Sequence, residues 1–363
     1  MSSKSGNANM SKAKSAKNDE FYTQLTDIEK EVKHYRDHFK NKVVFLNCDD
    51  PEYSNFWKYF AMNFERLGIK RLVSTHYANG KDTTYMMTID HSIPESMELN
   101  EFNYPKGITT DLTGDGDFRS DECIEILKSA DIVCTNPPFS LFREYVAQLM
   151  EYEKDFLIIG NQNAITYKET FPLLKDNSMF LGVHSNKVMW FQVPSSYPMI
   201  GSRVKEVDGS KFISVPAISW FTNMAYPKRY EDQLLFRKYK GHESDYPKYD
   251  NYDAIEVSRV KDIPADYDGA MGVPITFLNN HNPDQFEILG MIKGSDAFGV
   301  KRQKIYINPI QHSTGLTAKP DNNVNAAPAI KVRDVSGFKK YYTADNSDGY
   351  LISKYARIVI RRR

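Results

Sequence analysis

Short apolar runs alternate with segments of helical periodicity along the first part of the chain. The run Val43–Leu46 is followed by apolar side chains that recur at helical spacing from Phe56 to Leu67, where Gly68 ends the segment. Further runs that read as strands lie at residues 71–75, 132–135, 156–159 and 179–183. This alternation predicts an α/β fold with a mostly parallel sheet covered on both faces, and ligands at the carboxyl ends of the strands.

Composition divides the chain into three parts. Residues 1–18 lack apolar periodicity, and we expect a disordered basic tail there. Residues 19–225 carry the α/β pattern, although residues 78–110 look like an irregular polar insertion. Residues 226–363 are richer in Tyr, Pro, Asp and Lys and predict a second, less regular region.

Several classes of protein are disfavoured by the sequence. The apolar runs are far too short to cross a bilayer, and the N-terminus has no apolar signal region, so we expect a cytoplasmic protein without a membrane. The three cysteines, Cys48, Cys123 and Cys134, include no Cys-x-x-Cys pair and sit in or beside apolar stretches. They are expected to be reduced core residues, and no metal is expected.

Charge is balanced overall but not along the chain. The 47 basic and 47 acidic residues cancel, yet residues 1–17 hold four lysines and no acid, and residues 331–363 hold nine basic and three acidic residues. The C-terminal Arg361, Arg362 and Arg363 belong to the second cluster. Such ends can neutralise phosphates or can simply be solvated, and charge leaves both interpretations open.

The turn after the first predicted strand contains two adjacent carboxylates, Asp49 and Asp50, followed by Pro51. Asp50 suits the N-cap of the next helix because its side-chain oxygen can accept an unpaired amide hydrogen. Proline at the first helical position presets the helical dihedral. We therefore expect the helix to begin at Pro51.

The segment Asn136–Pro137–Pro138–Phe139 lies just past the strand predicted at residues 132–135. Two prolines fix the backbone and remove two amide donors, so an Asn oxygen and a backbone carbonyl can be held rigidly. Such acceptors could take both hydrogens of an aromatic amino group, which is otherwise a poor nucleophile, and Phe139 could stack on the ring. In the alternative interpretation, the prolines merely end the strand, with Asn as a cap and Phe in the core.

Further segments occur in the order of the successive motifs of one enzyme family. The sequence resembles the EcoRI-type adenine-specific DNA methyltransferases over residues 18 to about 290. The segments that carry the resemblance are NDEFYTQ (18–24), NCDDPEYSNF (47–56), GDGDFRSDE (114–122), TNPPFSLF (135–142), FLIIGNQNAITYKE, YPKYDNYDAI and MGVPITFL. The resemblance implies a Rossmann-like fold, S-adenosyl-L-methionine as cofactor, and methyl transfer to N6 of a flipped adenine in double-stranded DNA. It makes residues 226–363 a target-recognition region that contacts DNA.

The resemblance also assigns residues to the cofactor. Phe21, Tyr22 and Thr23 match the element that packs on the methionine part, although an aromatic staple on the core is an alternative. The turn Asn47, Asp49, Asp50 and Pro51 would lie near the cationic end or the ribose, but it lacks the usual glycines. Asp117 and Phe118 match the element that contacts the cofactor adenine, and Gly114 and Gly116 would permit its tight backbone. The acid usual after the second strand, near residues 74–77, is absent.

Three tyrosines and a lysine occur together in one segment of the second region. Tyr246, Lys248, Tyr249 and Tyr252 combine stacking surfaces with a positive charge, which suits nucleic acid. Tyrosine-rich loops are also commonly packed inside a protein, so two interpretations stand. The resemblance favours DNA contact.

Rival functions share the same motif. Asn-Pro-Pro-aromatic loops also serve enzymes that methylate RNA adenine or a protein glutamine amide. A nucleic-acid-binding module with a vestigial cofactor fold is a further alternative, to which the missing glycine turn lends some support. A fused restriction enzyme is disfavoured because the sequence shows no credible Pro-Asp with a downstream Glu-x-Lys nuclease signature.

Overall fold

The structure is a computed structural model that describes residues 22–78, 83–195, 197, 202–294 and 298–363. Contacts divide the chain into two compact units. Unit 1 runs up to Thr170 and includes Met179–Pro227, whereas unit 2 consists of Phe171–Ser178 and Lys228–Arg363. The predicted tail at residues 1–18 lies outside the described residues.

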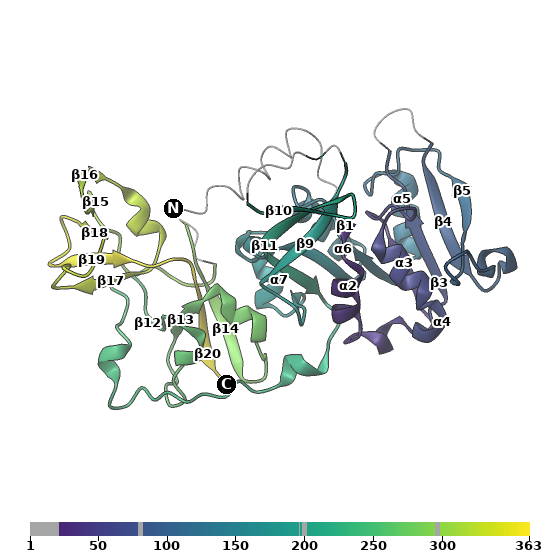
Figure 1. Cartoon of the computed structure of the whole chain (residues 1–363). Helices are drawn as coiled ribbons and strands as arrows, with labels where there is room; N and C mark the ends of the chain where they lie inside the picture. The colour runs from purple at the N-terminus through teal and green to yellow at the C-terminus, as the bar shows by residue number, and fades with distance from the viewer. Residues whose placement is uncertain (1–21, 79–82, 196, 198–201, 295–297) are drawn as a thin grey trace. The chain divides into compact units, whose positions relative to one another are not determined.

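Unit 1 is built on one large mixed sheet (Figure 1). Its strands are β1 (Tyr22–Thr23), β2 (Val43–Leu46), β3 (Arg71–Thr75), β4 (Tyr85–Asp90), β5 (Ile108–Asp111), β6 (Ile132–Thr135), β7 (Asp155–Asn161), β8 (Phe180–Leu181), β9 (Lys187–Val193), β10 (Val204–Val207) and β11 (Ser210–Thr222). The order is β1-β9-β11-β7-β6-β2-β3-β4-β5, and β8 and β10 also pair with β11. The α/β class predicted from the sequence is therefore present.

The prediction of a mostly parallel sheet is wrong. The pairings β2–β3, β2–β6 and β6–β7 are parallel, whereas every other pairing described in this sheet is antiparallel. The polar segment 78–110 contributes β4 and β5, which form an antiparallel pair on the edge of β3. Polar alternation on a half-exposed edge produced a weak strand signal there.

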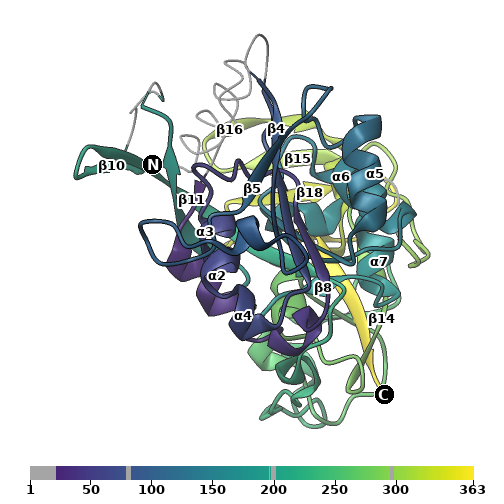
Figure 2. The same cartoon turned by 90° about the vertical axis from the view of Figure 1, so that its right-hand side faces the viewer.

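The α-helices of unit 1 are α2 (Leu25–Val32), α3 (Asn55–Met62), α4 (Phe64–Leu67), α5 (Asp121–Ser129) and α6 (Phe142–Glu151). Figure 2 shows α3 and α4 on one side of the sheet and α5 and α6 on the other. In α6 the buried residues Phe142, Tyr145, Val146 and Leu149 recur every three or four positions, which places them on one helical face. Both faces of the central strands are thereby covered, as the continuous apolar strand β6 requires.

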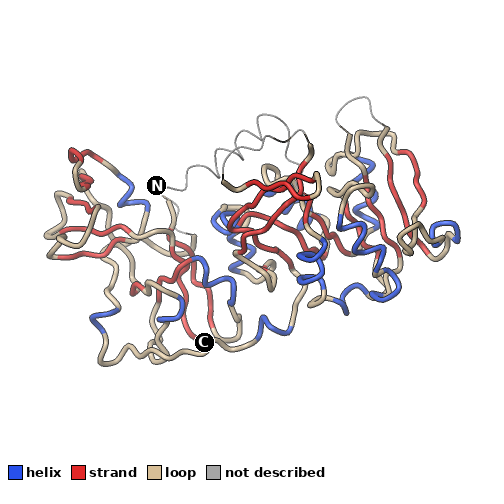
Figure 3. Tube along the Cα trace, viewed as in Figure 1, coloured by secondary structure: helices blue, strands red, loops and turns tan. Residues whose placement is uncertain are grey.

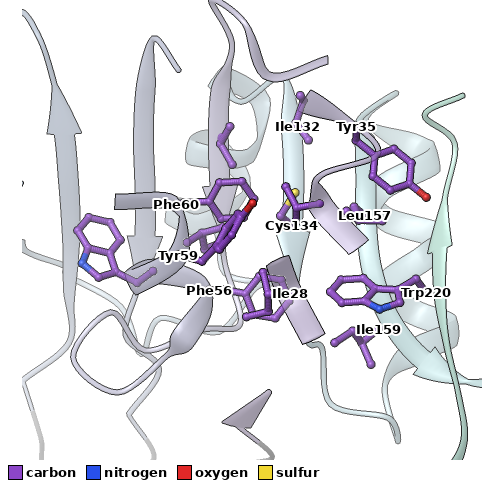
Figure 4. Close-up of a cluster of buried hydrophobic side chains, with 14 of the residues drawn as sticks. Ile28, Tyr35, Phe56, Tyr59, Phe60, Ile132, Cys134, Leu157, Ile159 and Trp220 are labelled. Carbon is purple, nitrogen blue, oxygen red and sulfur yellow. The ribbon is translucent and has the colours of Figure 1, made fainter. Parts of the chain in front are cut away.

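The core between the sheet and helices α2 and α3 is rich in aromatic side chains. Ile132 and Cys134 of β6 and Leu157 and Ile159 of β7 point to this face, because alternate residues of a strand share a face. Figure 4 shows these side chains together with Ile28, Tyr35, Phe56, Tyr59, Phe60 and Trp220. All three cysteines are free thiols, with Cys123 and Cys134 buried and Cys48 half-buried.

Helix α3 begins four residues later than the sequence suggested. It starts at Asn55, and its N-cap is Ser54, whose side chain accepts a hydrogen bond from the amide of Phe56 at 3.0 Å. Asp50 instead closes a turn by accepting from the amide of Glu52 at 2.9 Å. The prediction that Asp50 caps a helix beginning at Pro51 is therefore wrong, because the Asp50 side chain has other partners described below.

The regular structure of unit 2 is mainly β-strand, and loops join the strands (Figure 3). One sheet has the order β12 (Ile255–Glu256), β13 (Met271–Pro274), β20 (Arg357–Arg362) and β14 (Phe286–Ile292), and the other has the order β16 (Leu316–Pro320), β15 (Ile310–Ser313), β18 (Lys340–Thr343), β19 (Tyr350–Ser353) and β17 (Ala329–Val332). Helix α7 (Phe171–Lys175) also belongs to this unit.

Short 3₁₀ helices occur in both units. They are η1 (Arg36–Phe39), η2 (Pro94–Met97), η3 (Gln162–Thr166), η4 (Pro227–Tyr230), η5 (Glu243–Asp245), η6 (Val260–Asp262), η7 (Ile275–Asn280) and η8 (Asn322–Ala326).

The predicted functional division into a catalytic core at 19–225 and a target-recognition region at 226–363 remains a prediction.

Candidate active site

A cavity of about 410 Å³ lies in unit 1 at the carboxyl ends of β2, β3 and β6. Several separate segments line it: Tyr22, residues 47–50 with Tyr53, residues 75–77, residues 116–119, and Asn136, Pro138 and Leu141. This volume falls within the range of small-molecule sites. The cavity lies where an α/β sheet is expected to bind ligands, and it contains most of the residues predicted for the cofactor.

The N-terminal strand β1 is held at the rim by two kinds of contact. It pairs with β9, with Tyr22 opposite Gln192 and Thr23 opposite Phe191. The Asn55 side chain donates to the carbonyl of Thr23 at 2.7 Å. Tyr22 lines the cavity and Thr23 is buried, whereas the third predicted residue, Phe21, lies outside the described residues.

Asp49 is the most connected carboxylate of the site. It is only 8% exposed and accepts from the Ser54 hydroxyl at 2.7 Å, from the Thr135 hydroxyl, and from the amide of Asn136 at 3.3 Å. Burial raises the pKa of Asp49 to about 6, and the hydrogen bonds from Thr135 and Ser54 limit this rise. The carboxylate therefore joins the turn after β2 to the Asn136 turn after β6.

Asn47 occupies the end of β2 with its side chain in the cavity wall. Its Oδ1 accepts from the Tyr145 hydroxyl of α6, and burial raises the pKa of that hydroxyl well above its usual value. Among the described residues, the buried Nδ2 of Asn47 has no hydrogen-bond partner. A buried donor of this kind is suited to an acceptor group of a ligand.

Asp50 turns away from Asp49 toward the end of β3. Its Oδ2 lies 2.9 Å from Nδ1 of His76, and its Oδ1 accepts from the Tyr85 hydroxyl at 3.2 Å. The ring of His76 stacks on that of Tyr85, with 5.0 Å between the ring centroids and 22° between the planes. Asp50 and His76 line the cavity, whereas Pro51 does not.

A tight loop before α5 forms the opposite wall of the cavity. Gly116 has φ of +74°, and a Cβ atom there would lie 2.1 Å from the carbonyl oxygen of His76, so only glycine fits. The next residue, Asp117, makes two hydrogen bonds of 2.8 and 2.7 Å with the Arg119 side chain, and these bonds hold the pKa of Asp117 below its ordinary value. Phe118 is buried, with its ring edge-on to Tyr145 at 5.0 Å.

The Asn136–Pro137–Pro138–Phe139 segment forms a corner between β6 and α6. Asn136 and Pro138 line the cavity, and the carbonyl of Pro138 accepts from the amide of Leu141 at 2.9 Å. Pro137 is buried and Phe139 half-buried, and neither lines the cavity. The Phe139 ring lies edge-on to Phe191, 6.3 Å away. The corner therefore has one side on the cavity and another on the sheet edge near β9.

A family model described as adenine-specific methyltransferase EcoRI matches residues 9–363. The chain belongs to this adenine-specific methyltransferase family. It is 51% identical over 292 residues to the Type II methyltransferase M.EcoRI of Escherichia coli, covering 78% of this chain and 89% of the relative.

Two Mycoplasma proteins give further matches to the chain. It is 43% identical over 282 residues to the Type II methyltransferase M.MpnI of Mycoplasma pneumoniae, and 40% identical over 281 residues to the Type II methyltransferase M.MgeORF184P of Mycoplasma genitalium. Each match covers 77% of this chain and 84% of the relative. No solved structure gives a significant match. The family resemblance that the motifs indicated is confirmed.

Sequence reasoning missed the cavity residues Cys48, Tyr53, Thr75, His76, Tyr77, Arg119 and Leu141. His76 and Tyr77 directly follow β3, so their position at a strand end was an available signal. The turn after β2 carries Cys48 and Asp49 where glycines are usual, and both residues line the cavity.

The tyrosines predicted to contact DNA are buried in unit 2. Tyr246, Tyr249 and Tyr252 are 6%, 3% and 0% exposed. The Tyr246 hydroxyl donates to the carbonyl of Asp262 at 2.9 Å, and the Tyr249 hydroxyl donates to the buried Glu256. These contacts support the alternative in which the tyrosines are packed.

Lys248 and the C-terminal arginines carry the positive charge that the sequence singled out in the second region. Lys248 is exposed, and its Nζ lies 2.6 Å from Asp253. Arg361 and Arg362 lie in β20, and Arg361 pairs with Glu287 at 2.7 Å. An acidic neighbour therefore offsets part of this positive charge.

Within the described ranges, no helix is both long and apolar enough to cross a bilayer. In the same part of the chain, no group of three or more His, Cys, Asp or Glu side chains is arranged to hold a metal ion.

Proposed function

We propose that this protein methylates N6 of adenine at a specific site in double-stranded DNA, with S-adenosyl-L-methionine as methyl donor, as the modification enzyme of a restriction–modification system. The observation that carries the proposal is the double-proline corner, which presents Asn136 and Pro138 to a cavity of small-molecule size. Membership of the EcoRI methyltransferase family supports the same chemistry. Unit 1 would be a Rossmann-like catalytic core, with residues 226–363 for target recognition.

The residues around the cavity fit S-adenosyl-L-methionine. The buried Nδ2 of Asn47 can donate to the methionine carboxylate, and Tyr22 can cover the methionine chain. Asp117 can accept from the adenine amino group while Phe118 packs near the ring. Because Gly116 has no side chain, its backbone can lie close to the carbonyl of His76, which narrows the cavity at this point. When bound, the cofactor supplies a methyl group that its sulfonium has already activated.

The chain's own task is to orient and polarise the target amine. The Asn136 side-chain oxygen and the Pro137 carbonyl would accept the two N6 hydrogens, which favours a tetrahedral nitrogen with an available lone pair. Asp49 would hold the Asn136 amide and so fix the corner. Phe139, on the other side of the corner, would stack on the flipped base. The nitrogen held in this way would take the methyl group from the cofactor sulfonium, and one amino proton would pass to solvent.

Positioning of the target amine would supply most of the rate enhancement of methyl transfer, since no covalent intermediate is required. Cys134 is buried in the core and Cys48 has its pKa raised well above its usual value by burial, which disfavours a thiolate nucleophile at either position. The unstacking of the target base costs a few kcal/mol, which phosphate contacts and the base pocket would offset.

Replacement of Asn136 by Ala tests the mechanism. We expect the variant to lose most of its turnover, by roughly 100-fold or more as for loss of one preorganised polar contact. Cofactor affinity, measured by calorimetry, should remain near that of the wild type. The matched control is Asn63→Ala at the end of α3, outside the cavity. Near-normal turnover of Asn136→Ala on DNA would remove this mechanism.

The substrate is tested separately by transfer of tritiated methyl groups. Duplex DNA, RNA and total protein are offered to the same enzyme preparation, and label on adenine of duplex DNA alone is expected. Label on RNA or on glutamine would favour the rival substrates. Sequencing of modified bases in DNA from expressing cells would then identify the recognition site.

A further inference from the structure

The end of β3 lacks the carboxylate that commonly binds a ribose in nucleoside-binding sheets, and His76 stands there instead. We propose that His76 and Asp50 together bind the ribose hydroxyls of the cofactor, with the acid supplied from the turn after β2. This inference rests on the proposed function and adds a nucleoside subsite to it. It gives His76 a role for which no sequence motif accounts.

The contacts of Asp50 hold the pair in one arrangement. Its Oδ1 accepts from the Glu52 amide at 2.9 Å and from the Tyr85 hydroxyl at 3.2 Å. Its Oδ2 lies 2.9 Å from His76 Nδ1 but outside hydrogen-bonding geometry, so this oxygen keeps its capacity to accept from a ligand. Neither side chain is fully covered, since His76 is 22% and Asp50 17% exposed, and both line the cavity. The carboxylate is therefore fixed but still accessible to a ligand.

His76 is fixed from two further directions. Its ring stacks on Tyr85, and its amide donates to the Tyr85 carbonyl at 2.8 Å. Among the described residues, Nε2 of His76 makes no hydrogen bond with the protein, so this nitrogen remains for a ligand. A diol offers two hydroxyls that each donate and accept, so one hydroxyl can donate to the Asp50 carboxylate and a hydroxyl can also bond to Nε2 of His76.

The position of His76 and Asp50 within the cavity agrees with that of the ribose in a bound nucleoside. On one side, Asp50 directly follows Asp49 and the turn proposed for the methionine part. On the other side, the carbonyl of His76 is the atom that a Cβ of residue 116 would meet, next to Asp117. A ribose lies between the amino-acid part and the base of S-adenosyl-L-methionine. Asp50 and His76 thus lie between the residues proposed for the methionine part and those proposed for the adenine, where the ribose would be.

A purely structural contact between His76 and Asp50 is the alternative, and ligand analogues distinguish the two. The probe is S-adenosylhomocysteine, compared by titration calorimetry with its 2′-deoxy and 3′-deoxy analogues. If a hydroxyl contacts this pair, the wild type should bind at least one analogue about tenfold to 100-fold more weakly than the parent, as expected for hydrogen bonds to charged groups. His76→Ala should bind the parent with a similar loss and discriminate much less against that analogue.

The matched control is His91→Ala, which removes a half-exposed histidine after β4 that does not line the cavity. It should keep both the affinity and the discrimination of the wild type. If His76→Ala fails to fold by circular dichroism, His76→Gln replaces it, because the amide keeps a polar group near Asp50. The same loss of discrimination is expected.

The possible failures are distinguishable. Discrimination by His76→Ala or His76→Gln equal to that of the wild type would overturn the inference. A wild type that binds all three compounds equally would also overturn it while leaving the proposed function intact. A wild type that binds none of them would refute the cofactor of the proposed function itself.

Discussion

Replacement of Asp49 by Asn should change how the stability of unit 1 depends on pH. The Asp49 carboxylate is 8% exposed, and burial raises its pKa from 3.8 to about 6. Asn has nearly the same shape and no charge. Its oxygen can accept from the Asn136 amide, and its NH₂ group can donate to the Ser54 hydroxyl, which can rotate. We therefore expect the variant to fold.

The magnitude follows from the two pKa values. An acid whose pKa is higher in the folded state stabilises that state below pH 3.8, and this contribution is lost as the pH rises to about 6. The difference between 3.8 and about 6 corresponds to about 3 kcal/mol. Relative to the wild type, Asp49→Asn should therefore gain about 3 kcal/mol in free energy of unfolding between pH 3.5 and pH 7.

The assay is urea unfolding followed by tryptophan fluorescence across this pH range. All three tryptophans, Trp57, Trp190 and Trp220, lie in unit 1, so the signal reports on that unit. Other titrating groups cancel in the comparison of variant with wild type. The control is Asp155→Asn, an exposed carboxylate at the start of β7, for which a nearly constant difference is expected. A constant difference for Asp49→Asn as well would refute the claim that burial disfavours the charge.

Two further substitutions, each with a control, test the close backbone contact at Gly116 and the buried hydrogen bonds of Glu31. Gly116→Ala should weaken binding of S-adenosylhomocysteine at least about tenfold by calorimetry, because the new Cβ would lie 2.1 Å from a backbone oxygen. The control is Gly209→Ala, because Gly209 has the same φ of +74° but open space around it. This variant should lose only about 1 kcal/mol of stability and keep its affinity for S-adenosylhomocysteine. Equal effects of the two substitutions on binding would contradict the steric argument. Glu31→Ala should lower the free energy of unfolding by about 3–5 kcal/mol, since this fully buried carboxylate accepts from the Tyr35 hydroxyl at 2.8 Å and from two backbone amides. The exposed Glu29→Ala on the same helix should change the urea midpoint little, and a similar midpoint for both variants would refute the role of the buried network.

Much of the site could be placed from the sequence because its segments follow strands. The Asn47 turn and the Asn136 corner were located from apolar runs that end in polar residues, and parallel neighbours bring such ends to one edge. The loop at Asp117 was found through its motif. In each case the informative residues are contiguous in the chain.

Other features depended on partners distant in the sequence. The pairing of Asp50 with His76 and Tyr85 could not be read from the turn itself, where Asp50 looked like a helix cap. The tyrosines of residues 246–252 looked suited to DNA, but the hydroxyls of Tyr246 and Tyr249 donate to Asp262 and Glu256 inside unit 2. The antiparallel edge formed by β4 and β5 had no strong apolar alternation to indicate it.

The sequence by itself determined the α/β class, the family and the corner at Asn136, because local periodicity and contiguous motifs carry that information. The tertiary structure alone decided which of the two adjacent carboxylates contacts which neighbouring strand end. Asp49 joins the corner after β6, whereas Asp50 joins the end of β3. Adjacent carboxylates with the same intrinsic chemistry take different roles because their side chains meet strands on either side of β2 in the sheet.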